Sequence, residues 1–138
     1  MIRATDIRKR LPALRRHAFL LMGSRTAADA VLAIAVARLP RGDDGRPCAA
    51  DGTEIHRAVL DAAARVNCPP DTGLPPLMAR LLGMDLMTRA VIVLTVVDRL
   101  PPSEVAAVCG LPPEGMAAHL ARGREALEMR PAPRVMNL

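Results

Sequence analysis

The stretch 103–129, which reads SEVAAVCGLPPEGMAAHLARGREALEM, decides the fold class of this chain. Ser103 predicts the N-cap of a short helix, and Gly110 predicts the turn that ends it. The pair Pro112-Pro113 predicts the start of a second helix that reaches about residue 129. Two helices joined by a tight glycine turn form a helix-turn-helix.

The element before this motif, residues 86–99, is ambiguous by composition. Its segment Val91–Val97 (VIVLTVV) is rich in β-branched residues, which suit a buried strand as well as a helix. The chain offers no second strand to pair with it, and an isolated strand leaves its backbone groups without hydrogen bonds. We therefore expect a buried helix here and an all-α fold.

The N-terminal part also has the apolar spacing of helices. Apolar residues recur at steps of three and four from Ile7 onwards, and Gly23 ends this helix. Pro12 predicts either a kink in one helix or the first turn of a second helix. Ser24 predicts the cap of the next helix, residues 25–39. The residues expected on the buried stripe of that helix are Ala27, Ala30, Val31, Ile34 and Ala37.

The middle of the chain predicts two more helices and a linker. Thr53 predicts the cap of a helix that extends to about Asn67, and another helix covers residues 77–83. Residues 69–76 (PPDTGLPP) are rich in proline, which suits a linker between lobes.

This pattern predicts two small helical bundles joined by a proline-rich linker. The first bundle covers residues 1–68 and the second covers residues 77–130, with residues 69–76 between them. Residues 131–138 contain two prolines and are expected to form a disordered tail.

Length and composition restrict the class of protein. The 138 residues, of which 51% are hydrophobic, suffice for one domain or two small lobes. No apolar run has the roughly 18 residues of a membrane span, and no secretory signal follows the basic N-terminus, so we expect no membrane partner. The three cysteines form no C-x-x-C pair, which favours buried free thiols in a reducing cytoplasm.

No pattern in the sequence indicates catalysis or a metal. Ser, His and Asp residues form no recognisable nucleophile motif, and there is no glycine-rich phosphate loop. The spacing of Cys48, His56 and Cys68 matches no zinc site. We therefore expect no enzyme, no cofactor and no small-molecule substrate. His17 is expected at the edge of the core, and His56 and His119 on the surface.

Positive charge is concentrated at the N-terminus of a chain whose formal net charge is +5. Residues 1–25 contain seven basic residues and one acid, whereas residues 98–130 contain four basic residues and five acids. A DNA-reading lobe usually carries a basic surface, which the helix-turn-helix lacks. The N-terminal charge is either a solvated face or attracts an acidic partner or a nucleic-acid backbone.

Two stretches resemble bacterial sigma factors of the extracytoplasmic-function type. Residues 11–39 (LPALRRHAFLLMGSRTAADAVLAIAVARL) resemble their first conserved domain. Residues 86–127 (LMTRAVIVLTVVDRLPPSEVAAVCGLPPEGMAAHLARGREAL) resemble their promoter-reading last domain. In detail the chain is most similar to the sigma-like domain of PhyR-type general stress response regulators, which binds an anti-sigma factor of the NepR type. The resemblance implies a sigma-domain-2-like bundle over residues 1–68 and a sigma-domain-4-like bundle over residues 77–130.

The residues that a working sigma factor uses to dock on RNA polymerase are replaced here. On the second helix, the family's acid, glutamine and glutamate correspond to Ala30, Ala33 and Ile34. This change produces either an exposed apolar stripe, which usually means a protein partner, or a buried helix. The helix expected at residues 53–67 has no aromatic residue for capturing a melted base.

The residues that would read promoter DNA are replaced as well. On the recognition helix the family's Lys, Ser and Arg correspond to Ala117, Ala118 and His119. Alanine offers a base at most a contact to a thymine methyl group. Arg122 and Arg124 remain available to phosphates, but acids surround them. The positions that would face DNA are Glu114, Ala117, Ala118, His119, Arg122 and Arg124.

Three functional hypotheses follow from these departures. The leading one is a degenerate sigma mimic that binds an anti-sigma factor in a partner switch, with an amphipathic helix laid in a groove between or across the bundles. The second is a functional sigma factor that binds RNA polymerase core and promoter DNA, and the third is a scaffold without an anti-sigma partner. The expected partner contacts are Ala30, Ala33, Ile34, Ala37, Met116 and Leu120.

Overall fold

The computed structural model describes residues 4–49 and 51–128, and these residues are mostly helical. They contain no strand, only one isolated bridge between Arg41 and Pro47. The all-α fold class is confirmed. The helices are α1 (Ala4–Met22), α2 (Arg25–Arg38), α3 (Gly52–Ala63), α4 (Pro76–Leu82), α5 (Leu86–Ile92), the π-helical segment η1 (Val93–Val97), α6 (Pro102–Cys109) and α7 (Pro113–Glu128). The expected tail, residues 131–138, lies outside the described residues.

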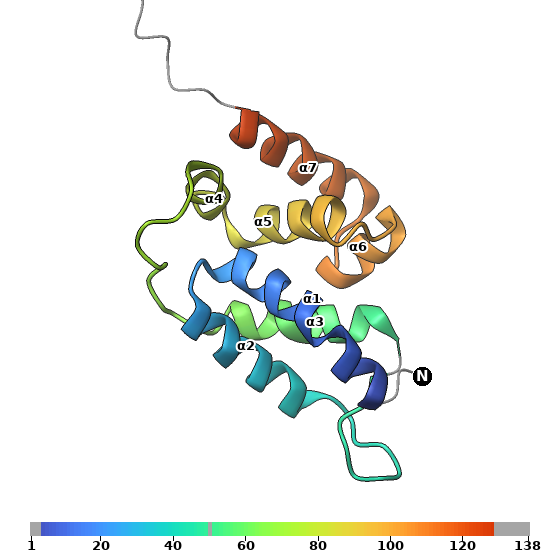
Figure 1. The fold of residues 1–138 in the computed structure, drawn as a ribbon. Coiled ribbons are helices and arrows are strands. Elements are labelled where there is room, and N and C mark those ends of the chain that lie inside the picture. Colours follow the sequence, from blue (N-terminus) through green and yellow to red (C-terminus); the bar gives the residue numbers. More distant parts are fainter. Residues whose placement is uncertain (1–3, 50, 129–138) are drawn as a thin grey trace, which may run out of the picture.

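The helices pack in two groups that meet along α1 and α3 (Figure 1). Helices α1, α2 and α3 contact one another; α1 also packs on α4, α5 and η1, and α3 packs on α6. One buried apolar cluster runs through both groups, from Val31 and Val59 to Val91, Leu94 and Val105. The two groups therefore share one core, and their division into separate bundles stays a prediction.

Several helix boundaries follow from local sequence signals, as expected. The hydroxyl of Ser24 accepts a hydrogen bond from the Ala27 amide at 3.1 Å and caps α2. Gly23 and Gly110 end α1 and α6 with φ values of +69° and +65°, a region that favours glycine. The ambiguous segment after Leu86 is helical, α5 continued by η1, which confirms a helix over a strand. It is buried from Ala90 to Leu94, whereas Val96 is exposed.

Of the two alternatives for Pro12, the structure shows one helix, because α1 runs through this residue. Other boundaries differ from the expectation. Asp51, not Thr53, caps α3, because Asp51 has the extended backbone of a cap and accepts from the Glu54 amide at 3.0 Å. Helix α3 ends at Ala63 instead of near residue 67. Helix α6 begins at Pro102 with no side-chain cap, so Ser103 lies inside its first turn.

The buried face of α2 also differs from the expected stripe. Ala30 and Ala37 are exposed and Ile34 is only partly buried, whereas the neighbouring positions face the core. Residues 30–37 are all apolar, so the spacing fits several stripes equally well. Packing on α1 and α3 selects the face opposite Asp29. The buried residues of α2 are Ala27, Ala28, Val31, Leu32 and Ala35.

Helix α7 approaches α5 closely because its buried residue is a glycine. A Cβ atom at Gly123 would lie only 2.3 Å from Cγ1 of Ile92 and 3.4 Å from Cγ2 of Thr88. Any side chain there would have to displace the buried side chain of Ile92. Gly123 therefore fixes the spacing of the helix-turn-helix against the core.

The side chain of Arg89 on α5 joins α5 to two other helix ends. Its Nε donates to the Leu81 carbonyl at 3.2 Å, and its Nη2 donates to the carbonyls of Leu82 at 3.3 Å and Met84 at 2.8 Å. Its Nη1 donates to the carbonyl of Leu21 in α1. Burial lowers the pKa of the Arg89 guanidinium. The four hydrogen bonds to these carbonyls compensate for the hydration that the buried charge loses.

We expect Arg89→Lys to destabilise the protein. The ammonium group of lysine lacks the planar fork of donors with which arginine reaches four carbonyls. Hydrogen bonds from a charged group contribute about 1.5–3 kcal/mol each, so the free energy of unfolding should fall by at least about 3 kcal/mol. Urea unfolding followed by circular dichroism measures the change. The exposed Arg124→Ala should stay within about 0.5 kcal/mol of the wild type. Equal midpoints for Arg89→Lys and the wild type would contradict this role.

The three cysteines should differ in reactivity. All three are free; Cys48 and Cys109 are buried and Cys68 is half-buried. Burial raises the pKa of Cys109 to about 11, so only roughly one thiol in a thousand is a thiolate at pH 8. We expect DTNB at pH 8 to label one thiol quickly in the native protein and three in denaturant. Cys68→Ser should remove the fast phase, and three equal native rates would contradict the expected burial.

Candidate partner-binding surface

An apolar groove lies where α4, η1 and the end of α7 meet α1. Its volume is about 310 Å³ and every residue that lines it is apolar. Leu77 of α4 is 61% exposed and Val96 of η1 is 56% exposed, more than any other large hydrophobic residue in the described part of the chain. An apolar surface of this kind usually marks a site for a protein partner. The other lining residues include Leu20, Met78, Leu81, Val97 and Leu127.

The sequence produces this groove because two apolar helices are covered on one side only. Helix α4 starts at a proline pair and has seven residues, of which Met78 and Leu81 are buried. Leu77, on the other side of this short helix, therefore stays exposed to solvent. In η1, Val93 and Leu94 are buried, whereas Val96 points away from the core. A helix that is apolar all round exposes apolar residues wherever the core does not cover it.

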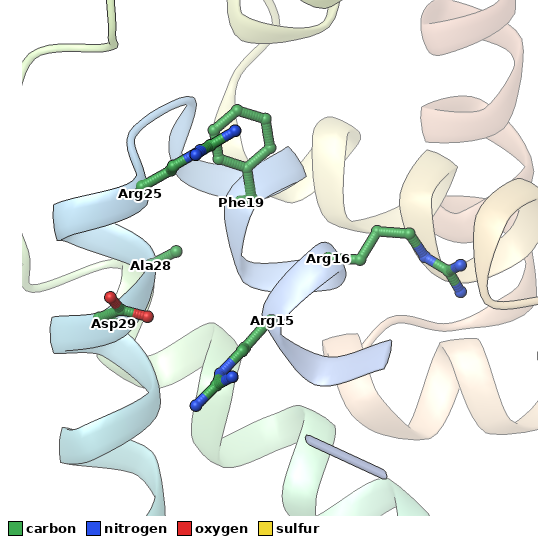
Figure 2. Close-up of a pocket in the computed structure, with 6 residues that line it drawn as sticks. All are labelled: Arg15, Arg16, Phe19, Arg25, Ala28 and Asp29. Atoms are coloured by element: carbon green, nitrogen blue, oxygen red, sulfur yellow. The ribbon is translucent and has the colours of Figure 1, made fainter. Parts of the chain in front are cut away.

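The exposed surface of α1 is basic. Between Ile7 and Met22 the helix carries five cations and no acid, and all five are exposed. Arg16 precedes Leu20 by one turn, so the two share a side of α1. Figure 2 shows Arg16 pointing toward the helices of the C-terminal half, away from Arg15. The five cations are Arg8, Lys9, Arg10, Arg15 and Arg16.

A second pocket of about 330 Å³ lies between α1 and α2, and charged residues surround it (Figure 2). Its lining residues are Arg15, Arg16, Phe19, Arg25, Ala28 and Asp29. Cations outnumber acids around this pocket, as they do along α1. This side of the molecule therefore attracts acidic groups.

The predicted contacts on α2 lie on the surface but outside the apolar groove. Ala30, Ala33 and Ala37 are exposed, and Ile34 is partly buried against the core. Ala33 lines an open depression of about 590 Å³ together with Leu32 and Val36. Helix α2 thus has one buried face and one exposed face of small apolar residues. The buried helix and the exposed apolar stripe, given as alternatives from the sequence, are both present.

The predicted contacts on α7 are less accessible. Met116 and Leu120 are partly buried and pack against the core, so they support the helix rather than cover its outer face. His119 was expected on the surface, but it is partly buried, and its Nδ1 lies 2.7 Å from the hydroxyl of Thr88. That hydroxyl also donates to Asp85 at 2.7 Å, and this hydrogen bond lowers the pKa of the Asp85 carboxyl.

The outer face of α7 carries the other predicted DNA-facing residues. Ala117 and Ala118 are exposed and offer no hydrogen-bond donors to bases. The charged residues of α7 are two cations and three acids, and all are exposed: Glu114, Arg122, Arg124, Glu125 and Glu128. This face lacks the excess of positive charge that phosphate contacts require.

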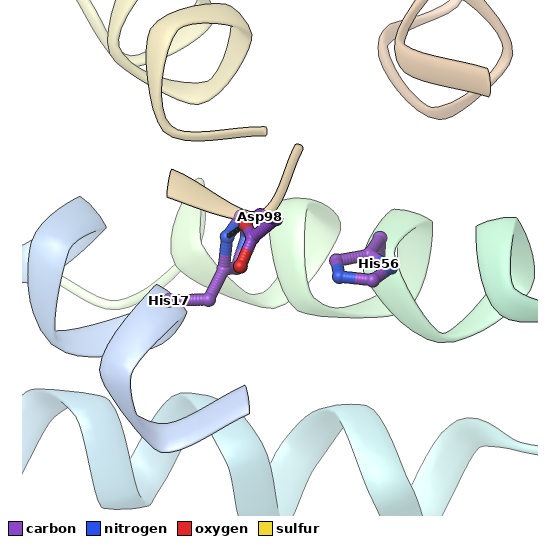
Figure 3. A group of neighbouring side chains, drawn as sticks. All are labelled: His17, His56 and Asp98. Carbon is purple, nitrogen blue, oxygen red and sulfur yellow. Dashed lines mark hydrogen bonds and ion pairs between the residues drawn. The ribbon is translucent and has the colours of Figure 1, made fainter. Parts of the chain in front are cut away.

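One polar cluster lies between the two groups of helices (Figure 3). His17 of α1 is fully buried, and its Nδ1 lies 2.6 Å from Oδ2 of Asp98, the residue after η1. His56 of α3 lies beside it, with the two ring centres 5.2 Å apart. His56 was expected on the surface, but it is partly buried. Burial, and then the neighbouring His17, lowers the pKa of His56 and so favours a neutral ring.

Sequence reasoning missed both the apolar groove and this cluster. The run VIVLTVV could have indicated the groove. A helix that buries only one side needs apolar residues on that side alone, so apolar residues on every side predict an exposed apolar surface. The cluster had no comparable signal, since His17 and Asp98 are 81 positions apart. The pair Cys48 and Cys68, considered with His56, does not belong to the cluster.

Comparison with known proteins adds no family assignment. No family model matches the chain, and no curated protein matches it in sequence. The resemblance to sigma factors therefore rests on the quoted residues alone. Within residues 4–49 and 51–128, no helix combines the length and the apolar character needed to cross a bilayer.

Proposed function

We propose that this protein is a degenerate sigma mimic, a binding module that receives an amphipathic helix of an anti-sigma factor in the apolar groove. The observation that carries the proposal is the exposure of Leu77 and Val96 on an entirely apolar groove. An amphipathic helix fills such a groove with residues at steps of three and four. The resemblance to sigma factors supplies the class of partner. The PhyR-type sigma-like domain, which this chain resembles most, binds an anti-sigma factor instead of polymerase and promoter DNA.

The charge around the groove favours a partner with an acidic polar face. Arg16 flanks the groove on α1. At the opposite side, Nη1 of Arg80 donates to the Leu127 carbonyl at 3.0 Å. Arg99, which is exposed, follows shortly after Val97. None of these cations lines the groove itself, but each lies near a residue that does: Leu20, Leu127 or Val97. Cations beside an apolar groove would steer an acidic amphipathic helix toward it.

The same surface supports the partner switch. If the anti-sigma helix occupies the groove of this protein, the true sigma factor is released from that anti-sigma factor. The alternative, a functional sigma factor, needs a basic outer face on α7, and that face has more acids than cations. No observation on α7 favours this alternative.

We expect the double variant Leu77→Asp/Val96→Asp to lose its partner. Burying each of these side chains contributes about 1.5–3 kcal/mol, so affinity should fall at least about tenfold. Tagged wild type and variant are purified from the native cell, and the bound proteins are identified by mass spectrometry. Binding of the recovered anti-sigma protein to both forms is then measured by calorimetry.

Two exposed positions supply matched controls, Ala33→Asp on α2 and Ala118→Asp on α7. Each introduces the same charge outside the groove and should leave the affinity unchanged. Loss of binding in Ala33→Asp but not in the double variant would place the partner on α2 and contradict the groove. Recovery of the polymerase β and β′ subunits, with promoter binding that weakens steeply as salt rises, would support a functional sigma factor instead.

A further inference from the structure

The cluster of His17, His56 and Asp98 brings together three side chains that commonly bind metal ions. Each offers one ligand atom, and these atoms lie within 4.8 Å of one another. Within the described residues, no other group of His, Cys, Asp and Glu side chains has this arrangement. The ligands come from α1, α3 and the residue after η1, so both groups of helices contribute.

The ring of His56 is oriented by a hydrogen bond that suits a metal ligand. The Nδ1 of His56 lies 2.9 Å from the Gly52 carbonyl, which requires the proton on Nδ1 and leaves a lone pair on Nε2. A backbone carbonyl that accepts from the second ring nitrogen is the usual support for a histidine ligand.

The backbone on either side of Asp98 is irregular. It follows the π-helical segment Val93–Val97, and the next residue, Arg99, has a φ of +55°. Among the described residues, Arg99 is the only one other than glycine with a positive φ. A π turn and a left-handed residue both cost free energy, and they concentrate at functional sites. Here they place the Asp98 carboxylate against His17.

We propose that His17, His56 and Asp98 form a binding site for a divalent transition metal ion, with zinc as the best match. Two imidazoles and one carboxylate are a common zinc ligand set, with water at the fourth position. With zinc–nitrogen distances of about 2.0–2.1 Å, two imidazoles on one tetrahedral ion place their ring centres about 5 Å apart. The observed separation is 5.2 Å.

The metal would replace the direct contact between His17 and Asp98. Ligand atoms on a tetrahedral zinc lie roughly 3.4 Å apart, so the 2.6 Å separation between Nδ1 and Oδ2 has to lengthen by under about 1 Å. A carboxylate on a loop residue can move this far by rotation of its side chain. The bound ion would then hold α1, α3 and the end of η1 together.

The test is a titration of the full chain without a polyhistidine tag, stripped of metal with a chelator, with Co²⁺ and then Zn²⁺. We expect one Co²⁺ per chain, visible d–d absorption and no thiolate-to-cobalt band in the near ultraviolet. Zn²⁺ should displace Co²⁺ because it binds such sites more tightly. The melting temperature should rise with the concentration of free Zn²⁺.

Three variants locate the site. His56→Gln and Asp98→Asn should each weaken Zn²⁺ binding by at least about tenfold, since even the outer partners of a ligand contribute about 10- to 100-fold. His119→Gln, which changes a partly buried histidine outside the cluster, should bind like the wild type. Circular dichroism confirms that each variant is folded, and the wild-type titration does not depend on any variant.

Two results would overturn the site. If the wild type binds neither ion up to about 1 mM, the cluster is a hydrogen-bonded contact only. If a thiolate band appears and both His56→Gln and Asp98→Asn bind normally, cysteines bind the metal. Neither result depends on the anti-sigma partner, so the groove proposal is tested separately.

Discussion

The arrangement of the helices depends on the hydrogen bonds that the Arg89 guanidinium donates. This group donates to Leu81 and Leu82 at the end of α4, to Met84 shortly after that helix, and to Leu21 at the end of α1. The last carbonyls of a helix have no partner within the helix, so one side chain satisfies the ends of two helices at once. This contact fixes α1 against α4. Leu20 and Leu81 of those two helices line the apolar groove, so the groove depends on it as well.

The two groups of helices meet through an apolar core with a few polar contacts at its edges. Besides Arg89, His17 contacts Asp98, and Nη2 of Arg57 on α3 donates to the Ala107 carbonyl on α6 at 2.7 Å. Apolar burial is not directional, whereas these hydrogen bonds specify one relative position of the two groups. A metal ion bound at His17 and Asp98 would therefore act on the same boundary, one turn of α1 before the Leu21 carbonyl that Arg89 holds.

The packing of α7 explains why protein binding is the better functional proposal. Gly123 brings the helix against Ile92, and Met116 and Leu120 pack toward the core. What remains outside is a face of alanines with three acids and two cations. The largest exposed apolar side chains, Leu77 and Val96, lie on a different part of the same half. The surface chemistry thus favours a helix as ligand over a nucleic acid.

The sequence by itself determined the helices, because their signals are local. Ser24 and Gly110 act through neighbouring backbone groups, and the valine-rich run after Ala90 had no strand to pair with. It did not determine which face of α2 is buried, since an all-apolar segment fits several stripes. Only the tertiary structure decided the groove and the cluster of His17 and Asp98, because both join residues far apart in the chain. Their positions depend on how helices pack, and helical spacing carries no information about the partner helix.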